Sequence, residues 1–249
     1  AFGPVIDRLA ANDIDLTKRS IEVAPIAHYH MGGVRVDARM ETEVPGLFAA
    51  GEAVGGANGA NRLSGNALSE AFVFGERAGR FAAAYVTGRQ SAWSEEAART
   101  ALDEIEASRN VAVKGTGPGL TGMLVELQEL MWRDAGLLRT QGGLDRALAR
   151  IREMRSEIGD HPSQSDHRFA LSMQDWFDLR NSLLAAEVIV LGAQIRTESR
   201  GAHQREDFPR SDPGQEHNLV TRLANGSLTV EPAPLVRKSY KLMPLEAAG

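Results

Sequence analysis

Residues 51–68 read GEAVGGANGANRLSGNAL, and an apolar pattern with helical spacing follows them directly. The stretch holds five glycines and three asparagines. Glycine lets a backbone approach a ligand closely and adopt positive φ, and Asn66 stands where a helix N-cap would stand. A glycine-rich loop that leads into a helix offers unpaired N–H groups and a positive dipole end to an anion. The pattern fits a nucleotide-binding loop, but it also fits a plain surface loop that ends in a cap.

Composition restricts the classes of function. The chain has 249 residues, which suggests one or two domains, and its net charge of −5 argues against nucleic acid as a main partner. No apolar run approaches the ~20 residues that span a bilayer. The absence of cysteine excludes disulfides and Cys-ligated zinc or iron–sulfur clusters within the chain. We therefore expect a cytoplasmic protein without a metal site and without direct membrane insertion.

The apolar pattern divides the chain into three parts. Residues 1–92 contain the glycine-rich loop, short strand-like runs at 34–36 and 47–50, and a helix from Asn66 to about Val86. Residues 93–210 carry long stretches of helical spacing and predict at least three long helices packed as an antiparallel bundle. Residues 211–249 form a tail in which Asn225-Gly226 predicts a short hairpin. Pro232 and Pro234 predict an edge-like or irregular second half for that hairpin.

Further motifs occur upstream and downstream of the glycine-rich loop. Residues 25–33 read PIAHYHMGG, residues 44–52 read VPGLFAAGE, residues 74–79 read FGERAG, and residues 196–209 read RTESRGAHQREDFP. Together with residues 58–68, they resemble, in the same order, the flavoprotein subunit of succinate dehydrogenases and fumarate reductases. The resemblance runs from about Pro25 to Pro209. Asn58, Ser64 and Ala67 depart from the His, Gly and Ser that are common in that family.

The resemblance implies an α+β, mainly α fold, with the C-terminal part of an FAD-binding domain followed by a helical bundle. It implies FAD as cofactor, a C4 dicarboxylate as substrate, and hydride transfer between the flavin and a C–C bond. No G-x-G-x-x-G turn for the ADP part of FAD occurs in the chain. We therefore expect the C-terminal half of a longer flavoprotein, with residues 1–24 as the end of a capping domain. The N-terminal half, which would supply the proton donor, and an iron–sulfur subunit are the expected polypeptide partners. The latter could place the protein at the inner membrane.

Two residues are the candidates for catalysis. A lone Arg is usually a solvated surface residue, but the family uses the counterpart of Arg62 to bind a substrate carboxylate, for which the guanidinium fork is suited. His28 could be a packed histidine bonded to a backbone carbonyl. The resemblance instead implies that it lines the substrate site and donates to the dicarboxylate.

The cofactor candidates follow the second strand-like run, residues 47–50. Gly51 and Glu52 stand at its end, where an acid can accept from a ribose or ribityl hydroxyl, and the resemblance implies that Glu52 contacts FAD. Asn66, Ala67 and Leu68 begin the following helix, and their N–H groups could meet the flavin where reduced flavin gathers negative charge.

Three alternatives remain open for the site and the activity. An L-aspartate oxidase shares the architecture but oxidises a C–N bond; Met31 stands where such oxidases tend to have Cys. The chain could also be an assembly fragment that is inactive and binds FAD weakly or not at all when alone. The cluster of Arg200, His203, Arg205 and Asp207 resembles a chemical site, but we expect it to be mainly structural.

Overall fold

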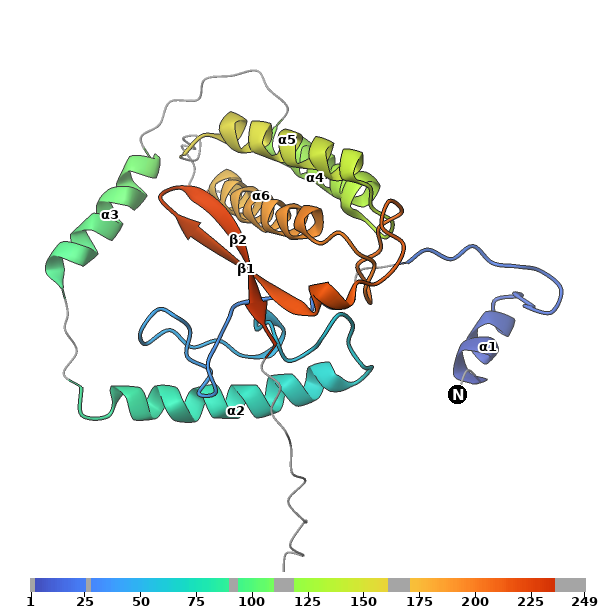
Figure 1. Ribbon diagram of the computed structural model, residues 1–249, viewed down its shortest axis with the longest axis horizontal. Coiled ribbons are helices and arrows are strands. Elements are labelled where there is room, and N and C mark those ends of the chain that lie inside the picture. Colours follow the sequence, from blue (N-terminus) through green and yellow to red (C-terminus); the bar gives the residue numbers. More distant parts are fainter. Residues whose placement is uncertain (1–2, 26–27, 90–93, 110–118, 161–170, 236–249) are drawn as a thin grey trace, which may run out of the picture.

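The computed structural model describes residues 3–25, 28–89, 94–109, 119–160 and 171–235 (Figure 1). The described chain is mainly helical, as expected from the sequence. Its helices are α1 (Gly3–Ala10), α2 (Asn66–Val86), α3 (Glu95–Arg109), α4 (Leu120–Ala135), α5 (Gln141–Ile158) and α6 (Leu171–Ile195). Two single 3₁₀ turns, η1 (Gly51–Ala53) and η2 (Pro213–Gln215), and one hairpin of β1 (His217–Ala224) and β2 (Ser227–Pro234) complete the elements. No helix in these ranges is long and apolar enough to cross a membrane.

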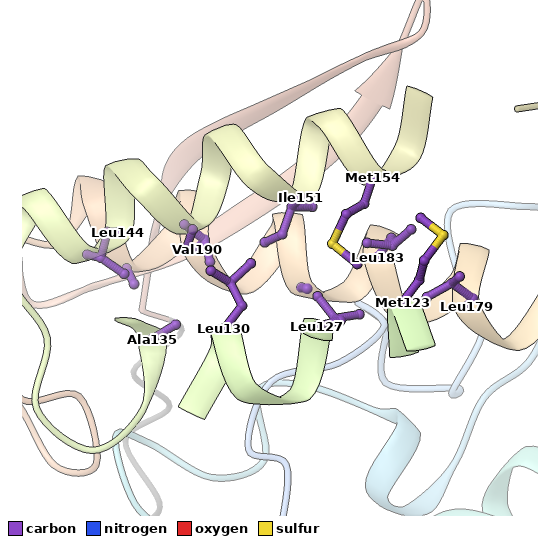
Figure 2. Close-up of a cluster of buried hydrophobic side chains, with 13 residues drawn as sticks. Met123, Leu127, Leu130, Ala135, Leu144, Ile151, Met154, Leu179, Leu183 and Val190 are labelled. Carbon is purple, nitrogen blue, oxygen red and sulfur yellow. The ribbon is translucent and has the colours of Figure 1, made fainter. Parts of the chain in front are cut away.

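The helices α4, α5 and α6 pack against one another as a three-helix bundle (Figure 1). Their buried apolar residues recur three and four positions apart, so each helix presents one continuous stripe to the others. Figure 2 shows these side chains meeting between the helices. The core comprises Met123, Leu127, Leu130, Ala135, Leu144, Ala147, Ile151, Met154, Leu179, Leu183, Ala186, Val190 and Ala193. The bundle confirms the prediction made from the apolar spacing.

The bundle also contains paired charges at its helix interfaces. The Asp134 carboxylate of α4 is 2.7 Å from the guanidinium nitrogens of both Arg133 and Arg146. The Glu187 carboxylate of α6 pairs with Arg152 and Arg155 of α5. Because each carboxylate is buried while its arginine partners reach solvent, these pairs satisfy the acids without burying the arginine charges.

The segment before α2 is held by a close approach between two stretches of backbone. Val34 and Val54 form a parallel bridge, in which the N–H of Val34 donates to the Ala53 carbonyl at 2.7 Å. A Cβ on Gly33 would lie 2.5 Å from that carbonyl oxygen, and one on Gly55 would lie 2.7 Å from the Gly33 nitrogen. Only glycine permits this contact at either position, and it places residues 28–34 beside η1.

The strand-like runs at 34–36 and 47–50 are only isolated bridges in the described structure. Val36 pairs with Thr42 and Glu41 with Phe48, and neither pair extends into a ladder. The prediction of short regular strands at these two places is therefore wrong. The local pattern identified the extended backbone correctly, but a ladder also needs continuous pairing with a neighbouring strand.

The C-terminal hairpin forms where Asn225-Gly226 predicted it. Asn225 and Gly226 have φ values of 51° and 76°, as a two-residue type I′ turn requires. The strand β2 continues through Pro232 and Pro234, which pair with Leu219 and His217. Alternate pairs in this register exchange no backbone hydrogen bonds, and both prolines fall in such pairs. Their missing N–H groups therefore cost the ladder nothing, so the second strand stays regular despite both prolines.

Candidate active site

Glu52 joins the two motifs that flank the bridge between Val34 and Val54. It lies in η1, and its Oε1 accepts the backbone N–H of His30 at 2.8 Å. Gly51, which precedes it, is buried and has a φ of 69°. The structure thus brings residues 28–33 and 51–55 together, as a shared site requires. The contact to His30 uses one carboxylate oxygen, which leaves the other for a hydroxyl of a ligand.

Arg62 lies beside the first of these motifs through Tyr29. The guanidinium carbon of Arg62 stands 4.3 Å from the centroid of the Tyr29 ring, in cation–π contact. Its Nη1 donates to the Leu63 carbonyl at 3.0 Å. Its Nε is shielded from water and has no hydrogen-bond partner within the described structure. An unpaired buried donor costs about 1–3 kcal/mol, which an acceptor on a ligand would relieve.

His28 lies next to Tyr29 in the chain and is exposed. It makes no hydrogen bond with another described residue, so the interpretation as a packed histidine bonded to a backbone carbonyl finds no support here. The described contacts join Arg62 to Tyr29 and not to His28. The role of His28 toward a substrate stays a prediction.

The first turn of α2 has no side-chain cap. The N-cap is Gly65, with a φ of 91°, and no described side chain bonds to this end of the helix. The N–H groups of Asn66 and Leu68 instead donate to the backbone carbonyls of Leu63 and Gly65 at 3.3 Å. The prediction that Asn66 caps the helix is therefore wrong: Asn66 is the first helical residue, because glycine takes the left-handed conformation that the preceding turn requires. Asn66, Ala67 and Leu68 still stand at the positive end of the helix dipole, but among the described contacts only the N–H of Ala67 has no acceptor.

A buried acid of α2, Glu70, joins three segments around Arg62. Its Oε2 accepts the Tyr29 hydroxyl at 2.6 Å, and its Oε1 accepts the Asn58 side-chain amide at 2.9 Å. The bond to Glu70, with burial, raises the pKa of Tyr29, so the phenol stays a donor. Glu70 does not stand out in the sequence as a site residue. Glu70 is the one buried residue of α2, and its helix neighbours Ala67 and Phe74 are half-buried, so only a weak apolar pattern marks that face in the sequence.

The turn after α6 reaches the glycine-rich loop. The N–H of Ala202 donates to the Ala60 carbonyl at 3.0 Å. Gly201 has a φ of 58°, and a Cβ there would lie 2.2 Å from the same carbonyl oxygen. The position therefore requires glycine both for its conformation and for space. This contact holds the loop two residues before Arg62.

Arg205 anchors that turn to the bundle. It is 1% exposed and donates to Asp207 through Nε and Nη2, to the Ala193 carbonyl through Nη1, and to the Gln141 side chain through Nη2. These bonds satisfy a carbonyl at the end of α6 and fix residues 199–207 against α5. These contacts of Arg205 agree with the expectation that the cluster is mainly structural.

His203 is a neutral member of the same cluster. Its Nδ1 lies 2.9 Å from Arg139 Nη1, and its Nε2 lies 3.1 Å from the Arg196 carbonyl oxygen. Burial lowers the pKa of His203, and the charge of Arg139 acts in the same direction. The geometry fits the tautomer in which Nδ1 accepts from Arg139 and Nε2 donates to Arg196.

Comparison with known proteins decides the family. Residues 125–246 match the family described as fumarate reductase flavoprotein C-term, and residues 4–68 match the family described as FAD binding domain. The chain belongs to the succinate dehydrogenase and fumarate reductase flavoprotein family, which includes the L-aspartate oxidases. Members of this flavoprotein family bind FAD.

Relatives with two different activities resemble this flavoprotein chain about equally. One of the subunits of the CoM/CoB fumarate reductase of Methanothermobacter marburgensis is 37% identical over 207 residues, 83% of this chain and 37% of that protein. The L-aspartate oxidase of Caulobacter vibrioides is 36% identical over 222 residues, 88% of this chain and 36% of that protein. The chain thus spans under two fifths of the length of these relatives.

Solved structures of the family share the fold of this flavoprotein chain. The Mycobacterium smegmatis Sdh1 complex in its apo form matches with a TM-score of 0.81 and 33% identity, over 94% of this chain and 41% of that one. A point variant of E. coli quinol fumarate reductase matches with a TM-score of 0.77 and 28% identity, over 93% of this chain and 41% of that one.

The residues of the site fit part of an FAD molecule. Gly33 and Gly55 serve the contact between two backbone segments of the chain, which places residues 28–34 beside η1. Glu52 keeps an oxygen for a hydroxyl, and at the start of α2 the N–H of Ala67 has no acceptor among the described residues and can meet an electron-rich group. An acceptor for a hydroxyl and an N–H donor for an electron-rich edge are the kinds of contact that a flavin with its ribityl chain uses.

Proposed function

We propose that this chain forms the substrate-binding and part of the flavin-binding surface of an FAD-dependent oxidoreductase that interconverts succinate and fumarate or a similar C4 dicarboxylate. The observation that carries the proposal is the set of contacts that the Arg62 guanidinium makes and leaves unmade. The guanidinium stacks on Tyr29, donates from one Nη nitrogen to its own loop, and keeps an unpaired Nε. An arginine fixed in this way keeps Nη2 for a substrate carboxylate, and a carboxylate that also reached the shielded Nε would satisfy that donor.

The proposed roles divide between substrate and cofactor. Arg62 binds one substrate carboxylate, and His28 donates a hydrogen bond that holds the substrate and stabilises developing negative charge. Glu52, with Gly51, holds FAD beside η1, while the N–H groups of Asn66, Ala67 and Leu68 face its electron-rich edge. When bound, FAD supplies the hydride acceptor or donor, and a partner segment supplies the proton donor.

Replacing Arg62 in the FAD-loaded enzyme tests the proposal. Losing a charged bidentate contact typically costs ~3–5 kcal/mol, so we expect Arg62→Ala to lower kcat/KM for succinate oxidation and fumarate reduction by ~10²–10⁴. Arg62→Lys should recover little, because an ammonium lacks the fork. The flavin content should stay near that of the wild type. Arg77→Ala, at an exposed arginine of α2, is the matched control. More than about a tenth of wild-type kcat/KM in both directions for Arg62→Ala would contradict the proposal.

An L-aspartate oxidase is the second candidate function. The 36% identity to the Caulobacter vibrioides oxidase favours it, while Met31 in place of the usual Cys favours the dicarboxylate. Assaying the same FAD-loaded enzyme with succinate, fumarate and L-aspartate separates the two. Turnover of L-aspartate without turnover of succinate or fumarate would decide for the oxidase.

We propose an iron–sulfur subunit and an N-terminal flavin-binding segment as partners. The fold likeness to the Sdh1 complex supports assembly with further polypeptides. If the chain is an assembly fragment, it will show neither bound flavin nor dye reduction with succinate when purified alone. Co-purification with a partner polypeptide that restores both flavin binding and dye reduction would then show that the partner carries the remaining parts of the site.

A further inference from the structure

The buried acid Glu70 lies outside the contacts that the proposed mechanism uses. It is 7% exposed and sits on α2, with the Tyr29 hydroxyl on one carboxylate oxygen and the Asn58 amide on the other. No basic side chain within the described structure pairs with it. A buried carboxylate held only by neutral donors is costly, which calls for a compensating role.

The two donors link Glu70 to both sides of Arg62. Tyr29 belongs to the motif with His28, and its ring face contacts the Arg62 guanidinium at 4.3 Å. Asn58 belongs to the glycine-rich loop, four positions before Arg62. The hydrogen bond to Glu70 holds the Tyr29 oxygen and so the long axis of the ring. Because a phenol O–H prefers to lie in the plane of its ring, the bond also favours one orientation of the face on which the guanidinium rests. A phenol that donates to a carboxylate also carries more electron density in its ring, which strengthens a cation–π contact.

We propose that Glu70 is a positioning residue that acts through Tyr29 to orient Arg62 for a substrate carboxylate. The inference rests on the proposed role of Arg62. Glu70 touches neither substrate nor flavin in this account. Glu70 holds the Tyr29 ring and the glycine-rich loop in place, so the Arg62 guanidinium is already oriented before the substrate binds. Less conformational entropy is then lost on binding.

The test measures binding in the FAD-loaded enzyme without turnover. Malonate, a three-carbon dicarboxylate without a bond to desaturate, is titrated by the change in flavin absorbance. We expect Glu70→Gln and Tyr29→Phe each to raise the Kd for malonate about tenfold, with flavin content unchanged. The double variant should lie within about twofold of either single variant, because both changes cut the same link. Glu76→Gln, at an exposed acid of the same helix, should bind as the wild type does.

The outcomes separate this inference from the function on which it rests. A wild-type enzyme that binds no dicarboxylate would overturn the proposed function. If the wild type binds malonate and Arg62→Ala does not, while Tyr29→Phe binds as the wild type, the role of Glu70 fails and that of Arg62 stands. Additive losses in the double variant would also overturn the inference, since Glu70 would then act by another route. Because Tyr29→Phe removes one hydroxyl and leaves the acid in place, it decides the matter even if Glu70→Gln does not fold.

Discussion

The backbone N–H of Ala202 donates to the carbonyl oxygen of Ala60 at 3.0 Å, so the turn after α6 holds the loop that carries Arg62. The two residues belong to different parts of the chain, the glycine-rich loop and the end of the bundle. Gly201 permits the contact, because it lies against the same carbonyl with a φ of 58°. The position of Arg62 therefore depends on the bundle as well as on its own loop.

Gly201→Ala should disturb Arg62 while leaving the bundle folded. A Cβ at this position would stand 2.2 Å from the Ala60 oxygen, so the turn and the loop must separate. The left-handed conformation adds about 1 kcal/mol of strain for a residue with a side chain. We expect kcat/KM for the dicarboxylate to fall about tenfold in the FAD-loaded enzyme. The control is Gly192→Ala in α6, where a Cβ meets nothing within 4 Å and should leave activity unchanged. Equal activity of the two variants would contradict the prediction.

Glu198 makes the stability of the turn depend on pH. Burial alone would raise the pKa of Glu198, but hydrogen bonds from Arg200 and from the N–H of Asp212 outweigh it and lower the pKa to about 2. Because the folded pKa is below the ordinary value, the stabilisation is fully present above about pH 4.5 and is lost as the pH falls toward 2.

Glu198→Gln should therefore destabilise the protein by about 3 kcal/mol at pH 7 and by less than half as much near pH 3, because the folded-state carboxylate stays mostly ionised until the pH approaches 2. The measurement is the free energy of unfolding in urea at both pH values. A conservative change at an exposed acid, Glu206→Gln, corrects for general effects of charge. A loss of stability for Glu198→Gln that is independent of pH would show that its ion pairs are not the cause.

Arg205→Lys should destabilise the protein although it keeps the charge. The guanidinium of Arg205 bonds at once to Asp207, to Gln141 and to the end of α6, and it is buried. A lysine offers three donors on a single nitrogen and cannot reach all of these acceptors. We expect a loss of about 2–4 kcal/mol in the free energy of unfolding. Arg210→Lys, at an exposed position in the same segment, should change stability by less than about 0.5 kcal/mol.

Local signals predicted the elements that depend on local physics. The apolar spacing of Leu144, Ile151 and Met154 predicted a bundle helix, and Asn225-Gly226 predicted the hairpin turn. Both rest on periodicity or on conformations that few residues adopt. The expected strands became isolated bridges, because pairing requires partners that a local pattern does not specify.

The site was predictable only in part for the same reason. The motifs identified Arg62 and Glu52, whose chemistry is typical of carboxylate and hydroxyl binding. Glu70 and Gly201 were missed, because their importance comes from what they touch. A buried acid on a helix and a glycine in a turn are ordinary in sequence, and only the fold brings them to Tyr29 and Ala60.

The bond between Ala202 and Ala60 also sets an order of events during synthesis. A ribosome adds roughly 5–20 residues per second, so the glycine-rich loop leaves it about ten seconds before the turn that holds it has been made. Over that interval the nascent loop has its glycines and its arginine but lacks its downstream anchor. A flavin that binds while the chain is still growing would therefore meet the glycine-rich loop, with Arg62, before the loop has reached its final position.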